Sequence, residues 1–180
     1  VDDYFNSAMR AIYNSSVPTV ARVNGAAAGG GFGLALACDI AVAAKSAFFV
    51  ATFGPKLGIV PDLGTTWNLP HKAGRARALG LAMLGDRISA EQAEAWGLIW
   101  KVVEDDQLDA EVELITKKLA RASADTMTRI RSVTDAALSN NFSDQLDLEM
   151  EHQAVLIPKN MTEGARAFME KREPDFPGRN

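Results

Sequence analysis

Apolar residues recur at both strand and helix spacing in the first hundred residues, and at helix spacing alone after them. Pairs of apolar residues three to four positions apart predict an amphipathic helix over 4–13. Short apolar runs predict a strand over 19–23 and a buried strand over 40–44. A further extended piece is expected at 48–50, and the last strand at 98–103. The pattern therefore predicts an α/β part followed by an all-helical part.

Helices are expected between these strands. The Ala- and Leu-rich segments 31–38 and 73–84 favour helix. Ser89, with Gln92 three residues later, forms a capping-box pattern that opens another short helix. Glycines and prolines interrupt 53–69, which predicts a loop, and functional groups concentrate in loops.

Length, charge and cysteine content exclude several classes of protein. The 180 residues suffice for a proper core, and the net charge of −4 without a basic run argues against nucleic acid as a partner. The single cysteine, Cys38, excludes an intrachain disulfide and favours a reducing compartment, the cytoplasm. Its apolar helical setting predicts a packed, inert thiol. No apolar run is long enough for a membrane span, so no membrane association is expected. The chain starts at Val1 without Met, and we expect a further N-terminal part.

The most informative stretch is the glycine-rich run from Gly25 to Gly33, which leads directly into a helical segment. Consecutive glycines allow positive φ angles and close approach of other backbone. A glycine turn that opens a helix presents free N–H groups at the positive end of the helix dipole, where an oxyanion or a phosphate is stabilised. The spacing is neither G-x-G-x-x-G nor a P-loop. A simple tight turn between packed elements is the alternative interpretation.

Asp62 is the carboxylate with the most unusual surroundings in the sequence. It stands in the apolar loop 58–64, with Trp67 nearby. Desolvation there would raise the pKa of its carboxyl group, as a general acid or base requires. Alternatively, Asp62 caps the turn or the helix that follows. The two histidines, His71 and His152, have no metal-site spacing, and His152 is expected on the surface of a helix.

Taken together, these segments resemble the crotonase, or enoyl-CoA hydratase/isomerase, superfamily. The matching pieces are Pro18–Gly25, Ala28–Gly31, Ala37–Ile40, Leu57–Pro61, Gly85–Ala90, Ala93–Leu98 and Glu163–Arg172. The resemblance implies a ββα spiral core over 1–104, without its N-terminal part, and a helical trimerisation region over 105–180. It implies an acyl-CoA thioester substrate, a homotrimer or dimer of trimers, and no metal or redox cofactor, since CoA is part of the substrate.

The resemblance also assigns roles to residues. Gly30 N–H matches one donor of the family's oxyanion hole, and the other donor maps before Val1. Hydratases of the family carry glutamates at positions that match Gly33 and, less definitely, Gly54, and neither is a carboxylate here. Asp62 matches the base of family isomerases. These include the 1,2-epoxyphenylacetyl-CoA isomerases of phenylacetate degradation and some Δ3,Δ2-enoyl-CoA isomerases, and the sequence around Asp62 is particularly similar to the phenylacetate group. The expected substrate-binding residues are Ala28, Gly29, Phe32, Gly33, Trp67, Phe168 and Lys171, the last two reaching the CoA of an adjacent subunit.

The sequence therefore predicts a cytoplasmic acyl-CoA isomerase in which Asp62 shuttles a proton and Gly30 polarises the thioester carbonyl. Two alternatives stay open. One is an enoyl-CoA hydratase that activates water with Asp62 alone. The other is a non-catalytic protein of this fold that binds acyl-CoA or a partner, favoured by the missing carboxylates at Gly33 and Gly54.

Overall fold

The computed structural model describes residues 2–176, which divide into two compact units. The first unit comprises the described residues up to Ser15 together with Thr19–Leu114. The second comprises Ser16–Pro18 and the described residues from Ile115 onward. The division falls within helix α6 (Leu108–Arg121). No helix among the described residues has both the length and the apolar character needed to cross a bilayer.

Two small sheets form the frame of the first unit. The first sheet is parallel, with strand order β1 (Val20–Val23), β3 (Ile40–Ala44) and β6 (Lys101–Val103). The second has the order β2 (Ala26–Ala28), β4 (Phe48–Val50) and β5 (Ile88–Ser89), with β4 parallel to β2 and antiparallel to β5. The chain enters the first sheet, crosses to the second and then forms helix, and it does so twice. This is the expected ββα spiral.

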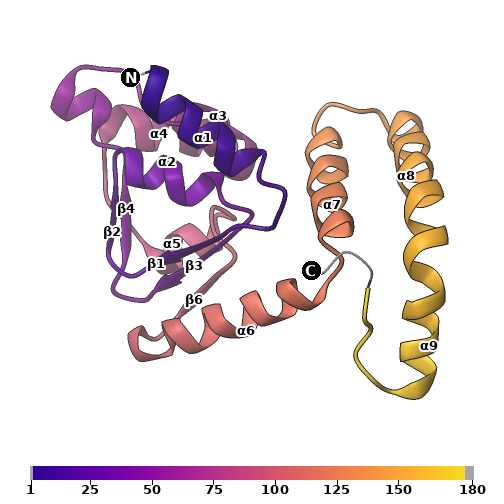
Figure 1. Cartoon of the computed structure of the whole chain (residues 1–180). Coiled ribbons are helices and arrows are strands. Elements are labelled where there is room, and N and C mark those ends of the chain that lie inside the picture. Colours follow the sequence, from indigo (N-terminus) through magenta and orange to yellow (C-terminus); the bar gives the residue numbers. More distant parts are fainter. Residues whose placement is uncertain (1, 177–180) are drawn as a thin grey trace. The chain divides into compact units, whose positions relative to one another are not determined.

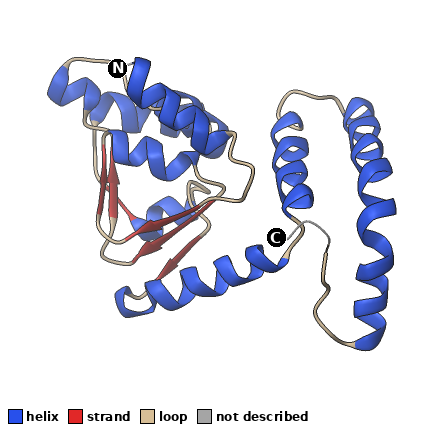
Figure 2. Ribbon diagram, in the orientation of Figure 1, coloured by secondary structure: helices blue, strands red, loops and turns tan. Residues whose placement is uncertain are grey.

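Helices cover the strands of the first unit, as Figures 1 and 2 show. Their bounds are α1 Ser7–Tyr13, α2 Gly30–Ala37, α3 Thr65–Ala73, α4 Arg75–Leu84 and α5 Ala90–Ala95, with the π-helical turns Asp2–Asn6 and Phe53–Leu57 and the 3-10 turn Asp105–Gln107. Phe32 from α2 packs on Phe49 from β4, with ring centroids 5.2 Å apart. Both side chains are fully buried, together with Leu36 and Leu69, so α2 and α3 are anchored in the same core.

Most of the predicted elements are confirmed, although the strand expected at 98–103 begins only at Lys101, and two predictions are wrong. The helix expected at 31–38 is α2, and Ser89 caps α5 by accepting a hydrogen bond from Gln92 N–H at 3.1 Å. The run read as one glycine turn instead contains β2, because small alanines between Gly25 and Gly29 pair with β4. The segment 53–69 is not all loop, since it holds a π-helical turn and the start of α3.

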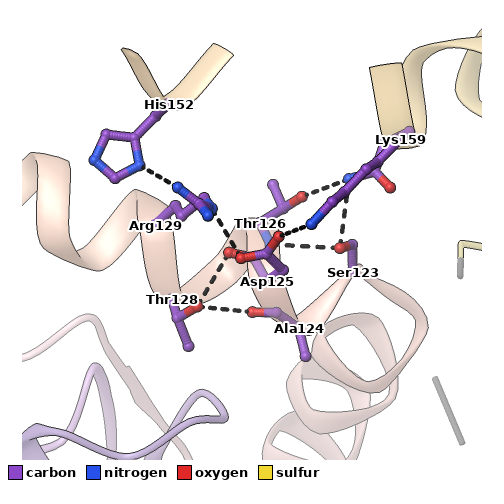
Figure 3. A network of polar contacts seen from close by, with 9 residues as sticks. Ser123, Ala124, Asp125, Thr126, Thr128, Arg129, His152 and Lys159 are labelled. Carbon is purple, nitrogen blue, oxygen red and sulfur yellow. Dashed lines mark hydrogen bonds and ion pairs between the residues drawn. The ribbon is translucent and has the colours of Figure 1, made fainter. Parts of the chain in front are cut away.

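The second unit contains an antiparallel helical hairpin (Figure 1). Its elements are α7 (Ala124–Ala136), α8 (Phe142–Leu156), the π-helical turn Ile157–Met161 and α9 (Thr162–Glu170). A polar network joins α7, α8 and the π-helical turn, as Figure 3 shows. Asp125 accepts hydrogen bonds from Arg129 at 2.8 Å and Lys159 at 3.2 Å, which hold the pKa of its carboxyl group below its ordinary value.

His152 lies on α8, so the helix expected around it is present, and the residue belongs to this network. Its Nδ1 lies 3.0 Å from Arg129 Nη1 and accepts a hydrogen bond from it, because a guanidinium has no acceptor. The ring is half-buried because α7 lies alongside α8 at this point.

A second polar cluster closes the end of α9. Arg172 donates to Glu163 at 2.6 Å and 3.2 Å and to Glu170 at 2.6 Å. Asp175 N–H also donates to Glu163, at 2.9 Å. The Arg172 hydrogen bond and the Asp175 N–H lower the pKa of Glu163 to about 2, so this carboxylate stays ionised far below its ordinary range.

Candidate active site

The glycine turn places the N–H group of Gly30 at the start of α2, where no backbone carbonyl of the described residues accepts it. Gly29, the residue before the helix, has φ +54°, and its own N–H donates to Val50 carbonyl at 2.9 Å. Gly29 carbonyl accepts from Phe32 N–H at 3.0 Å and from Gly33 N–H at 3.4 Å. Within residues 2–176, Gly30 N–H has no backbone acceptor. This donor therefore stands at the positive end of α2, where a developing oxyanion is stabilised.

Asp62 is held at the start of a tight turn that runs straight into α3. Its carbonyl accepts a hydrogen bond from Thr65 N–H at 3.0 Å. The two residues between them both have positive φ, +50° at Leu63 and +75° at Gly64. Asp62 itself is half-buried. The turn fixes the backbone of Asp62 directly before α3.

The Asp62 turn lies directly on the glycine turn of α2. A Cβ added to Gly30 would lie 2.5 Å from Leu63 Cδ1, and one added to Gly33 would lie 2.5 Å from Leu63 carbonyl oxygen. At Gly33 the neighbour is backbone, so this close approach requires glycine, whereas at Gly30 the neighbour is the end of the flexible Leu63 side chain. The residue next to Asp62 is therefore in contact with the helix turn that presents Gly30 N–H. Sequence reasoning missed this contact, although a glycine inside an Ala- and Leu-rich helix signals close backbone approach.

Thr65 lies at the same contact and was also missed. Its side chain is fully buried, and its hydroxyl has no hydrogen-bond partner among the described residues. The hydroxyl oxygen lies 2.7 Å from the Cβ position of Gly33. The Cβ position of Gly33 therefore lies close to both a backbone carbonyl and a hydroxyl.

Gly54 also has a close neighbour. A Cβ there would lie 2.9 Å from the carbonyl oxygen of Ala82 in α4. Because the neighbour is backbone, it moves only if the helix moves. Neither Gly33 nor Gly54 has free space for a side chain as long as the present packing holds.

Phe32 and Trp67, two aromatic residues expected to bind substrate, differ in exposure. Trp67, on α3, is 43% exposed. Its ring stacks on His71 with centroids 4.2 Å apart and meets Tyr13 edge-on at 5.8 Å. His71 Nδ1 donates a hydrogen bond to Trp67 carbonyl at 2.6 Å, and this bond fixes the orientation of the His71 ring. Phe32, in contrast, is a core residue with no exposed surface.

The remaining expected residues lie in three places. Ala28 ends β2, directly before Gly29, so both belong to the glycine turn. Phe168 and Lys171 lie in the second unit, where Phe168 is 84% exposed on α9 and Lys171 has φ +52° just after the helix end. Cys38 donates to Leu34 carbonyl, and burial raises the pKa of its thiol, so it stays protonated at neutral pH and is a poor nucleophile.

Comparison with known proteins identifies the family. The model of the enoyl-CoA hydratase/isomerase family matches residues 2–179. The chain belongs to the enoyl-CoA hydratase/isomerase family. It is 43% identical over 180 residues to a 1,2-epoxyphenylacetyl-CoA isomerase of Escherichia coli K12, covering 99% of this chain and 68% of that protein. It is 42% identical over 172 residues to a probable enoyl-CoA hydratase of Rhodobacter capsulatus, covering 95% of this chain and 66% of that protein.

Solved structures of this family share the fold. An enoyl-CoA hydratase from Polaromonas sp. JS666 aligns with TM-score 0.88 and 36% identity over 95% of this chain and 66% of its own. An enoyl-CoA hydratase from Bacillus anthracis aligns with TM-score 0.89 and 32% identity over 97% of this chain and 67% of its own. The expected crotonase-type fold is confirmed. The chain spans about two thirds of the length of these family members.

Proposed function

We propose that this enzyme of the hydratase/isomerase family is an acyl-CoA isomerase, in which one carboxylate, Asp62, moves a proton between two carbons of the substrate. The observation that supports this most strongly is the packing around Gly33 and Gly54. By the family resemblance, one glutamate of hydratases falls at the position that matches Gly33, and the second falls near Gly54. Here the Leu63 and Ala82 carbonyls lie 2.5 Å and 2.9 Å from the Cβ positions, so neither glycine has room for a carboxylate side chain.

The proposed reaction converts a 3-enoyl thioester into the conjugated 2-enoyl thioester. Asp62 carboxylate removes a proton from the α-carbon, and the electron pair forms a double bond to the carbonyl carbon, which leaves the negative charge on the thioester oxygen. Gly30 N–H at the start of α2 stabilises this enolate oxygen. The enolate then collapses, the double bond shifts to the α,β position, and the protonated Asp62 returns the proton to the γ-carbon. The net change is the movement of one proton and one double bond.

Several finer features belong to this proposal. Trp67, whose ring is fixed by Tyr13 and His71, supplies an exposed apolar wall five residues after Asp62. Phe168 and Lys171 contact the CoA of an adjacent subunit in a homotrimer or a dimer of trimers, with Lys171 pairing with a phosphate. The relative from Escherichia coli is named for an aromatic ring epoxide, which makes aromatic acyl groups of phenylacetate degradation candidates. The single cysteine supports a reducing compartment, the cytoplasm.

Hydration is the second candidate, because the relative from Rhodobacter capsulatus is a probable enoyl-CoA hydratase. In that case Asp62 would activate a water molecule for addition to a 2-enoyl-CoA. The same carboxylate would serve both reactions, so the substrate that is consumed separates them.

The test incubates the full-length protein with a 3-enoyl-CoA and, separately, with a 2-enoyl-CoA, and follows the absorbance of the conjugated thioester. Absorbance growing from a 3-enoyl-CoA in wild type, and abolished in Asp62→Ala, is the result expected for the isomerase. Absorbance lost from a 2-enoyl-CoA would contradict it and favour hydration. Acyl-CoA binding that Asp62→Ala leaves unchanged, with no turnover of either substrate or of the ring epoxide, would instead indicate a binding protein.

A further inference from the structure

Leu63, the residue that follows Asp62, adopts a backbone conformation that leucine rarely takes. Its φ is +50°, and that of Gly64 is +75°. With the hydrogen bond from Thr65 N–H to Asp62 carbonyl at 3.0 Å, the segment has the pattern of a type I′ turn. The first central position of such a turn favours Gly, Asn or Asp. A leucine there works against its own backbone preference, so a contact outside the turn must favour it.

That outside contact is with α2, and Leu63 makes it with two different groups. Its Cδ1 lies 2.5 Å from the Cβ position of Gly30, and its carbonyl oxygen lies 2.5 Å from the Cβ position of Gly33. The side chain therefore covers the residue that presents the free N–H, and the backbone covers the next turn of the same helix. The two contacts together fix both the position and the orientation of the peptide that follows Asp62.

The consequence concerns the separation of the two groups that act on the substrate. In the proposed function, Asp62 carboxylate reacts at the α-carbon while Gly30 N–H binds the oxygen two bonds away. Two groups that act on neighbouring atoms of one substrate must be held within a fraction of an ångström of their productive positions. The two residues lie on separate elements, the Asp62 turn and α2, and Leu63 joins these elements directly.

Building on the proposed function, we propose that Leu63 is a positioning residue that sets the distance between the Asp62 carboxylate and the Gly30 N–H. Its left-handed backbone aims its carbonyl at Gly33, and its apolar side chain holds the turn against Gly30. Leu63 itself touches no reacting atom in this role.

Two substitutions separate positioning from folding. Leu63→Gly suits the turn, since glycine adopts positive φ freely, but it removes the side chain that lies on Gly30. Leu63→Met keeps a long apolar side chain of similar volume and serves as the conservative rescue. Each full-length variant is compared with wild type in melting temperature, in kcat and KM for a 3-enoyl-CoA, and in a crystal structure that gives the distance from the Asp62 carboxylate to Gly30 nitrogen.

For Leu63→Gly we expect a melting temperature within about 3 °C of wild type. Its kcat should fall by about tenfold or more, with KM within about threefold. Leu63→Met should keep kcat within about threefold of wild type. The carboxylate-to-nitrogen distance should change in Leu63→Gly and stay as in wild type in Leu63→Met. An unchanged distance in Leu63→Gly would overturn the inference, and so would wild-type kcat or a kcat loss that only follows unfolding. If wild type itself does not isomerise a 3-enoyl-CoA, the proposed function fails, while the crystallographic distances still decide the role of Leu63.

Discussion

Replacing Gly33 by alanine tests the packing that supports a single-carboxylate mechanism. The new methyl group would lie 2.5 Å from Leu63 carbonyl oxygen, 2.7 Å from Thr65 hydroxyl oxygen and 3.2 Å from Leu63 carbonyl carbon. Two of these three neighbours are backbone atoms, so the Asp62 turn has to move away from α2. The substitution should therefore affect both stability and catalysis.

The size of the stability effect follows from two opposing contributions. Alanine is favoured over glycine inside a helix by about 0.5–1 kcal/mol. Inserting a methyl group into close-packed surroundings costs about 1–3 kcal/mol. Subtracting the helix contribution from the packing cost gives a loss of about 0–2.5 kcal/mol for Gly33→Ala.

Gly80 provides the matched control, because it lies inside α4 and has no atom within 4 Å of its Cβ position. Gly80→Ala should raise the free energy of unfolding by about 0.5–1 kcal/mol and leave activity unchanged. Urea denaturation of both variants measures the free energies of unfolding, and the 3-enoyl-CoA assay measures kcat. Displacement of the turn should lower kcat of Gly33→Ala by about tenfold to a hundredfold. A Gly33→Ala protein as stable and as active as Gly80→Ala would refute the reasoning.

Two further predictions concern stability alone. Thr65→Val replaces a buried hydroxyl that has no partner among the described residues by a methyl group. It should raise the free energy of unfolding by about 1 kcal/mol. The control is Thr66→Val at an exposed position, which should leave stability nearly unchanged. A loss of stability in urea denaturation would show that the hydroxyl has a partner. Glu163, whose pKa is lowered to about 2 in the folded protein, adds stability above its ordinary pKa that is lost as the pH falls from about 5 toward 2. The melting temperature of wild type should therefore fall more steeply than that of Glu163→Gln across this range, and parallel curves would contradict the Arg172 hydrogen bonds.

Local signals in the sequence were enough for most elements of the fold. The Ala–Leu run of α2, the apolar run of β3 and the Ser89 cap of α5 each depend on residues close together in the chain. The strand β2 was missed because alanines carry little strand preference of their own, and its strand state comes from pairing with β4. Local pattern predicts elements well where local preference and tertiary packing agree.

The candidate site was only partly accessible from the sequence. The motif around Asp62 and the glycine turn at Gly30 pointed to two separate segments of the chain. Their contact depends on Leu63, which is 30 positions from Gly33 and adopts a φ that leucine seldom takes. No periodicity or composition reports such a contact, because it arises from how α2 and the Asp62 turn pack together.

Exchange of the α-proton of a saturated acyl-CoA in deuterium oxide tests the central claim most directly. A saturated substrate allows proton removal and return but neither isomerisation nor hydration, so the exchange isolates the step assigned to Asp62 and Gly30 N–H. Proton NMR should show exchange by wild type and none by Asp62→Asn, although the variant still binds the acyl-CoA. Exchange by Asp62→Asn at the wild-type rate would contradict the account, because another group would then remove the proton.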